Sequence, residues 1–160
     1  MVKHFPLLCL VAMTWLTACE NPTEPVPESA TGYDAELAAA YGADDYGMKS
    51  YVMAFLYAGP NRDRDSLEAA ALQRGHMENI GRLAEEGKLV LAGPFMGSDS
   101  LRGIYVFDVS TVEEARELTA TDPAIRAGSL VMELKPWYGS AALVGVNGVH
   151  KRLAGRGVTE

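Results

Sequence analysis

The sequence predicts an α+β fold of the ferredoxin-like class, with elements in the order β-α-β-β-α-β and two helices on one face of a four-stranded antiparallel sheet. Two observations lead to this prediction. Four apolar runs with strand character lie between Tyr51 and Trp137, and helical segments follow the first and the third of them. The runs are also nearly continuous in apolar residues, which is typical of strands that are covered on both faces.

The first strand and the first helix are bounded by local signals. The run Tyr51–Ala58 has the composition of a strand, and Gly59 follows it as a stop. Asp65 and Glu68 then have the spacing of a capping box and predict a helix that runs to about Glu86. These signals define the first β-α pair of the fold.

The second and third strands form a predicted hairpin. Gly87 is the expected C-cap of the first helix, and the strand Lys88–Phe95 follows it directly. Residues 97–101 are the expected hairpin loop, and Arg102–Val109 is the third strand.

The second half of the unit contains a second helix, a short third helix and the last strand. Ser110 or Thr111 caps the second helix, which runs to about Thr121. Asp122-Pro123 then begins a short helix, because aspartate suits a cap and proline suits the first turn. Ser129–Trp137 is the fourth strand.

The apolar strands require a cover for the second face of the sheet. A second copy of the chain, packed sheet to sheet as a homodimer, would cover it. The alternative cover is an N-terminal extension, residues 33–50, with one short helix near Asp34 that docks on the domain, residues 51–142. The chain after the domain is glycine-rich and basic, and we expect residues 143–160 to be a loose tail.

The N-terminus predicts export. Lys3 precedes an apolar run, Phe5–Leu16, that is too short to span a bilayer and has the length of a signal-peptide apolar region. The run ends in Leu-Thr-Ala-Cys, which resembles the lipobox of bacterial lipoproteins, so residues 1–18 are expected to be cleaved and Cys19 to carry lipid. The alternative is an ordinary secretory signal with a chance cysteine.

The segment after the cysteine predicts a tether and a location. Residues 19–32 are rich in proline and polar residues, and this composition cannot form a core. Glu20 stands where an aspartate would resemble an inner-membrane retention signal. The expected location is therefore the periplasmic side of the outer membrane in a bacterium with two membranes, with the lipid anchor as the membrane contact.

Composition argues against several classes of function. The 160-residue chain has a formal net charge of −7, so nucleic-acid phosphates repel it and nucleic acid is not an expected partner. Its two cysteines, Cys9 and Cys19, precede the domain, which leaves no disulfide and no thiolate metal site there. One histidine in the predicted core argues against catalytic zinc, which typically takes three protein ligands. The sequence contains no nucleophile elbow, P-loop or dinucleotide glycine fingerprint, and we expect no cofactor.

His76 is the candidate for proton-transfer chemistry. With Leu72, Ile80 and Leu83 it falls on one face of the first helix, so its imidazole is expected to point toward the sheet. A half-buried histidine titrates near neutral pH and can move a proton in either direction. The alternative is a core histidine whose ring a backbone carbonyl satisfies. Asp122 also has a plain structural interpretation as the N-cap of the short helix.

Six short motifs occur in order along the domain. They are Arg74-Gly75-His76, Glu86-Gly87-Lys88-Leu89, Ala92-Gly93-Pro94-Phe95, Arg102-Gly103-Ile104, Thr121-Asp122-Pro123 and Lys135-Pro136-Trp137. Together they resemble the YCII-related (YciI-like) domain family from Tyr51 to about Ala142. Tyr46–Met48 and Pro136–Gly139 resemble a secreted subgroup of that family.

The resemblance implies a fold, an assembly and a site. The implied fold is a dimeric ferredoxin-like α/β barrel, which agrees with the strand pattern. The implied site is an active-site pair formed by His76 and Asp122. Relatives in the wider superfamily include a dehydrochlorinase and lactone isomerases that act on small ring compounds, so the implied chemistry rests on analogy of fold.

Three functions are compatible with these observations. The first is a cofactor-free enzyme of isomerase or lyase type, in which His76 is the general base or acid and Asp122 fixes its tautomer. Its candidate substrate-orienting groups are Tyr57, Arg74, Arg102 and Arg126, although each arginine can also be read as charged surface. The second is a module that binds a small ligand or an envelope protein without chemistry. The third is a structural lipoprotein with a vestigial pocket.

Overall fold

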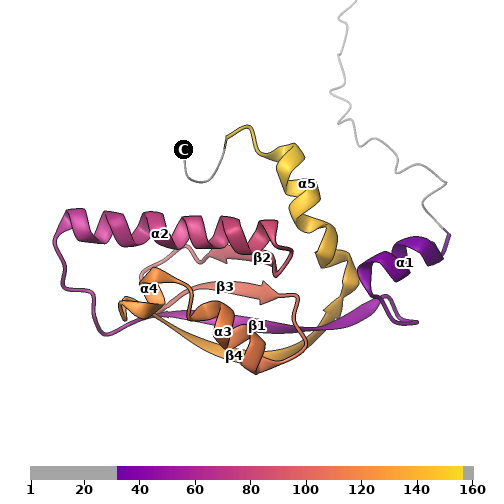
Figure 1. Cartoon of the computed structure of the whole chain (residues 1–160), viewed down its shortest axis with the longest axis horizontal. Coiled ribbons are helices and arrows are strands. Elements are labelled where there is room, and N and C mark those ends of the chain that lie inside the picture. Colours follow the sequence, from indigo (N-terminus) through magenta and orange to yellow (C-terminus); the bar gives the residue numbers. More distant parts are fainter. Residues whose placement is uncertain (1–31, 157–160) are drawn as a thin grey trace, which may run out of the picture. The chain divides into compact units, whose positions relative to one another are not determined.

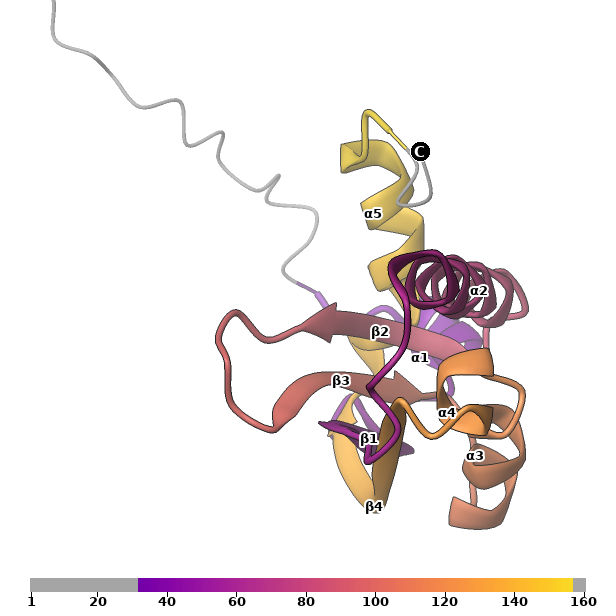
Figure 2. The same ribbon diagram turned by 90° about the vertical axis from the view of Figure 1, so that its left-hand side faces the viewer.

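The computed structural model describes residues 32–156 and contains a four-stranded antiparallel sheet with helices α2, α3 and α4 on one face (Figures 1 and 2). The strands are β1 (Met48–Ala58), β2 (Leu89–Pro94), β3 (Leu101–Phe107) and β4 (Leu130–Ser140). The helices between them are α2 (Ser66–Glu85), α3 (Val112–Thr119) and α4 (Pro123–Arg126). The element order and the strand order β2-β3-β1-β4 confirm the predicted ferredoxin-like α+β fold.

The helices begin where the sequence predicts. Asp65 caps α2, because its carboxylate accepts two backbone N–H groups of the first turn at 2.9 and 2.8 Å. Thr111, rather than Ser110, caps α3 by accepting the N–H of Glu114 at 3.1 Å. Gly87 follows α2 with a φ of +71°, a left-handed conformation that favours glycine after a helix.

Strand β1 is a central strand of the sheet. It pairs with β4 along its full length, from Met48 opposite Ser140 to Ala58 opposite Leu130, and with β3 on its other side. The strand begins before its predicted start at Tyr51, because β4 is long enough to offer backbone partners to the three preceding residues.

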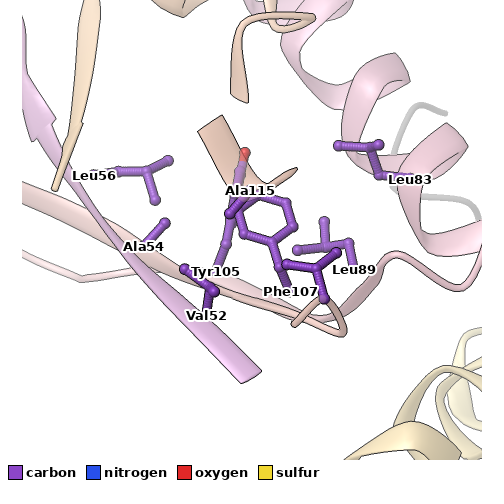
Figure 3. Close-up of a cluster of buried hydrophobic side chains, with 9 residues drawn as sticks. Val52, Ala54, Leu56, Leu83, Leu89, Tyr105, Phe107 and Ala115 are labelled. Atoms are coloured by element: carbon purple, nitrogen blue, oxygen red, sulfur yellow. The ribbon is translucent and has the colours of Figure 1, made fainter. Parts of the chain in front are cut away.

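The main core lies between the sheet and its helices (Figure 3). Its buried members are Val52, Ala54, Leu56, Leu83, Leu89, Tyr105, Phe107, Val109 and Ala115. Because side chains alternate along a strand, the even-numbered residues of β1 face the helices and the odd-numbered ones face the opposite side. This alternation divides the strand residues between a helix-covered face and a second face.

The second face of the sheet is covered in part by residues that follow β4. Leu143 belongs to the 3-10 helix η2 (Ala141–Gly145). It packs against a second apolar cluster that contains Tyr51, Val90 and Val106. Elsewhere on this face apolar side chains remain exposed, as Val131 at 44% illustrates.

The N-terminal extension forms the short helix that the sequence predicts. Helix α1 (Ala35–Tyr41) begins at Asp34, whose carboxylate accepts the N–H of Leu37 at 2.9 Å. Its main contacts are with η2. There Gly145 lies so close to Tyr41 that an added Cβ would stand 2.6 Å from the tyrosine hydroxyl. The described part of the extension thus supports the chain after β4.

The chain after the domain differs from the loose tail expected for residues 143–160. Helix α5 (Val146–Leu153) follows η2 directly. The side-chain amide of Asn147 donates to the carbonyl of Leu89 in β2 at 2.7 Å, which fixes the helix to the sheet edge. Tertiary contact therefore stabilises a segment whose composition favours a tail.

The predicted signal segment, Cys19 and nearly all of the tether lie outside the residues that the structure describes. Within residues 32–156, none of the helices combines the length and the apolar character that crossing a membrane requires.

Candidate functional site

A cavity of about 1360 Å³ opens beside α2 and is bordered by β2, the start of β3 and α5. His76 and Tyr105 both line it. The cavity is also lined by residues of the loop after β1, such as Arg62, and of the segment before β4, such as Ser129. Elements that are far apart in the sequence therefore meet around one space.

His76 and Asp122 form a buried pair at this cavity. Nδ1 of His76 lies 2.7 Å from Oδ2 of Asp122, although 46 residues separate them in the sequence. His76 is 8% exposed and Asp122 is 1% exposed. The other carboxylate oxygen of Asp122 accepts the N–H of Ala124 at 2.8 Å and caps α4. The two interpretations of Asp122, helix cap and histidine partner, therefore hold at the same time.

The neighbours of the imidazole assign its tautomer. A carboxylate accepts hydrogen bonds, so Nδ1 of His76 carries the proton that is donated to Asp122. Nε2 is then an acceptor, and the hydroxyl of Tyr105 lies 3.3 Å from it. Tyr105 donates to Nε2, and the three side chains form a chain from phenol to imidazole to carboxylate.

Tyr105 is held in the protonated state by its surroundings. Burial raises the pKa of Tyr105 above its ordinary value, and the negative charge of Asp122 raises it further. The ring stacks on His76 at a centroid distance of 6.2 Å and packs edge-on against Phe107 at 5.8 Å. The side chain is therefore a fixed hydroxyl donor.

Helices α2 and α4 approach closely at this pair. A Cβ added at Gly75, next to His76, would lie 3.0 Å from Cγ of Pro123, next to Asp122. This distance is tighter than ordinary contacts, so glycine here permits the approach that brings the imidazole to the carboxylate.

A second polar cluster holds the residue before Asp122. The guanidinium of Arg82 donates to Oδ1 of Asn79 at 2.8 Å and to Oγ1 of Thr121 at 2.9 Å. The hydroxyl of Thr121 donates to the same Asn79 oxygen at 2.9 Å. Asn79 and Arg82 belong to α2, so this cluster fixes the start of α4 relative to the helix that carries His76.

The four weaker sequence candidates are not brought together. Arg102 borders the cavity, and its guanidinium donates to the carbonyl of Asp99 at 3.4 Å. Tyr57 lies on the second face of the sheet, where its hydroxyl donates to Glu133 at 3.4 Å. Arg74 and Arg126 are exposed and do not line the cavity.

Sequence reasoning missed Tyr105. It sits two residues before Phe107 in β3, and strand alternation places both on the helix-covered face. An assignment of the two faces of β3 could have identified it, but the unbroken apolar run Ile104–Phe107 conceals which face is which.

Within residues 32–156, the structure places no group of three or more His, Cys, Asp or Glu side chains where they could hold a metal ion.

Comparisons with known proteins identify sequences that are similar to this chain. Residues 51–138, more than half of the chain, match the YCII-related domain family. The uncharacterized protein YjpA of Bacillus subtilis (strain 168) is 40% identical over 63 residues, which cover 39% of this chain and 72% of YjpA.

A solved structure is also similar to this chain. It is the 5-chloro-2-hydroxyhydroquinone dehydrochlorinase TftG from Burkholderia phenoliruptrix AC1100, in complex with 2,5-dihydroxybenzoquinone. The TM-score is 0.41 at 16% sequence identity, and the match covers 54% of this chain and 92% of that one.

Proposed function

The chain belongs to the YCII-related domain family, and we propose that it is a cofactor-free enzyme that transfers a proton on a small organic molecule. The observation that carries the proposal is the His76–Asp122 contact of 2.7 Å at the wall of a cavity. Nδ1 is committed to the carboxylate, so Nε2 is the basic atom that a substrate would meet.

The proposed reaction begins with proton abstraction. Nε2 of His76 takes a proton from a carbon of the substrate next to a carbonyl group. The C–H electron pair forms a new C=C bond while the carbonyl π pair moves to the oxygen, which gives an enolate. Asp122 stabilises the imidazolium that forms. When a substrate binds, the hydroxyl of Tyr105 turns from Nε2 to the substrate oxygen on which negative charge develops, which frees the lone pair of Nε2. Its raised pKa keeps the hydroxyl protonated.

The second half of the reaction determines its class. If the proton returns from Nε2 to a different carbon, the substrate is isomerised. If the electron pair instead expels a leaving group from the neighbouring carbon, the reaction is an elimination and the proton leaves to solvent. Both outcomes begin with His76 as the base, and the isomerisation also needs it to return the proton as an acid.

A solvent-exchange experiment tests the proposal. The protein is incubated in D₂O with a panel of cyclic ketones and unsaturated lactones, and deuterium incorporation is followed by NMR. His76→Ala is expected to lower the catalysed exchange by about 100-fold or more. Tyr57→Phe, on the other face of the sheet, is expected to leave it unchanged. Full exchange activity in a folded His76→Ala protein would contradict the proposal.

The second candidate function is a non-catalytic binding module. The low exposure of His76, at 8%, favours it, because a catalytic imidazole must meet its substrate. A binding module would retain bound ligand in the His76→Ala variant and would show no deuterium exchange with any compound of the panel.

We also propose that the protein acts as a homodimer packed through the second face of its sheet. Exposed apolar side chains on this face support the proposal, with Val131 at 44% and Trp137 at 36% exposure. A monomer would leave this apolar surface in water, whereas a second copy would cover it.

The proposed location is the cell envelope, with the protein as a lipoprotein of the secreted subgroup. The support is the sequence around Cys19 and the apolar run before it. A Cys19→Ser substitution in the full-length precursor is expected to abolish incorporation of labelled fatty acid. Retained labelling would contradict lipid attachment at this cysteine.

A further inference from the structure

Helix α5 lies outside the segment that matches the family, yet it forms part of the wall of the cavity that His76 also lines. Its cavity-lining residues are Val146, Asn147, His150 and Lys151, and the C-cap Ala154 follows them. The spacing of these four helical residues, one, three and one, places them on one face of a helix. Arg152 falls on the opposite face and does not line the cavity.

Two contacts hold this face against the cavity. The side-chain amide of Asn147 donates to the carbonyl of Leu89 at 2.7 Å. The preceding η2 is fixed between Tyr41 of α1 and the apolar cluster on the second face of the sheet. The views in Figures 1 and 2 agree that α5 rises beside the β2 edge of the sheet. The position of α5 is therefore defined in part by α1, which precedes the matched segment in the sequence, and by η2, which follows it.

The charge of the cavity is opposite to that of the chain. The chain has a formal net charge of −7. The cavity is lined by six basic residues, Arg62, Arg64, Arg82, Arg102, Lys151 and Arg156, and by two acidic ones, Glu78 and Glu85. A positive cavity in an acidic protein favours an anionic ligand over a neutral one.

Two of these basic residues are already paired. Arg64 lies 3.4 Å from Glu68, and Arg82 lies 2.8 Å from Glu86. Within residues 32–156, no carboxylate lies at ion-pair distance from Lys151. Its ammonium group is thus available to a ligand.

We propose that the cavity binds a small organic anion with an apolar body, and that Lys151 of α5 binds its anionic group. Apolar side chains of α2 and β2, such as Leu72, Ile80 and Ala92, contact the body of the ligand. The inference rests on the proposed function for the identity of the cavity, and it adds the substrate class and a specificity residue that the family domain does not contain.

A matched pair of fluorescent probes tests the proposal on the folded chain. The anionic probe is 1-anilinonaphthalene-8-sulfonate, and the neutral probe is N-phenyl-1-naphthylamine, which lacks the sulfonate. Lys151→Gln is expected to weaken binding of the anionic probe by about three- to tenfold, the range for loss of one exposed charged contact. Binding of the neutral probe is expected not to change. Lys151→Glu is expected to weaken binding of the anionic probe further, and Lys151→Arg is expected to retain it.

Two control variants separate the cavity from other surfaces. Arg152→Gln removes a charge from the other face of α5 and is expected to leave both affinities unchanged. Lys135→Gln removes a charge beside Phe55 on the second face of the sheet. Equal weakening by Lys151→Gln and Arg152→Gln, or weakening by Lys135→Gln in place of Lys151→Gln, would overturn the proposal.

The test is independent of turnover. A His76→Ala protein that retains deuterium exchange refutes the enzymatic proposal without changing the probe result. An anionic affinity that does not depend on Lys151 refutes the role of α5 while His76-dependent exchange persists. Each result therefore identifies which of the two proposals has failed.

Discussion

The hydroxyl of Tyr105 lies 3.3 Å from Nε2 of His76, on the opposite side of the imidazole from Asp122. The histidine is therefore held between a neutral donor and a carboxylate. The arrangement leaves Nε2 as the ring nitrogen that can accept a proton.

The role of the phenol can be separated from that of its ring. Tyr105→Phe keeps the stacking on His76 and removes the hydroxyl donor. We expect deuterium exchange to fall on the order of 10²-fold, the typical effect of one lost transition-state donor. The unfolding free energy should fall by about 1 kcal/mol, measured by urea denaturation. Unchanged exchange would show that the hydroxyl has no part in the reaction.

The two roles of Asp122 can be separated by two substitutions. Asn caps a helix about as well as Asp, so Asp122→Asn should change the unfolding free energy by less than about 1 kcal/mol. Its amide selects the other tautomer of His76, and exchange should fall on the order of 10³-fold or more. Asp122→Ala loses the cap as well and should be less stable than Asp122→Asn by about 0.5–2 kcal/mol. Equal stability of the two variants would contradict the capping role.

The close approach of α2 and α4 makes a prediction about two glycines of one helix. Gly81 has no heavy atom within 4 Å of an added Cβ, so Gly81→Ala should stabilise the protein by about 0.5–1 kcal/mol through helix propensity. At Gly75 the added Cβ meets Pro123 at 3.0 Å. Gly75→Ala should gain less stability, and it should lower exchange because α4 carries Asp122. Thermal denaturation of the two variants measures the difference, and equal stabilisation would contradict the packing argument.

Tyr51 predicts how stability changes at alkaline pH. Burial, followed by the charge of Asp108, raises the pKa of Tyr51 to about 12 from the ordinary value of 10.0. The folded state keeps the proton longer than the unfolded state, so this contribution to stability is complete below pH 10 and is lost as pH rises toward 12. In Tyr51→Phe the fall in unfolding free energy above pH 10 should be smaller by about 1–2 kcal/mol.

Urea denaturation at pH 8, 10 and 11.5 tests this prediction. Tyr51→Phe also loses the hydrogen bond from its hydroxyl to the carbonyl of Ser140, 3.0 Å long. The variant should therefore be less stable than the native protein at pH 8, by about 1 kcal/mol. Parallel pH profiles of unfolding free energy for the two proteins would rule out Tyr51 as the source of the stability loss above pH 10.

The proposed dimer predicts a difference between two exposed apolar residues. Val131→Glu places a charge on the second face of the sheet and should convert the dimer to a monomer in light scattering. Leu67→Glu is the matched control, because Leu67 is 82% exposed in the first turn of α2, away from that face. A monomeric native protein, or a dimer that survives Val131→Glu, would contradict the proposed assembly.

Much of the fold could be predicted because its signals are local. Asp65, Thr111 and Asp122 each cap the helix that follows them within three residues, and the caps depend on no distant contact. The order of elements that these signals predict is the order that the structure has. The family resemblance pointed to His76 and Asp122, which spacing alone left as a core histidine and a cap.

The remaining features depend on contacts between distant segments. Tyr105 reaches His76 across 29 residues, and no local pattern in β3 marks it. Helix α5 has a glycine inside it and its apolar residues Val149 and Leu153 are exposed, so its place comes from the hydrogen bond between Asn147 and Leu89. Physical chemistry of the local sequence favours a tail there, and tertiary structure overrides that preference.

The bond between Asn147 and Leu89 has a consequence for how the protein behaves at high concentration. Strand β2 is an edge of the sheet, and an edge strand offers its backbone groups to any other chain that can pair with it. The amide of Asn147 occupies one of these carbonyls, and α5 stands beside the strand. The helix therefore obstructs strand-to-strand aggregation at this edge, in addition to lining the cavity.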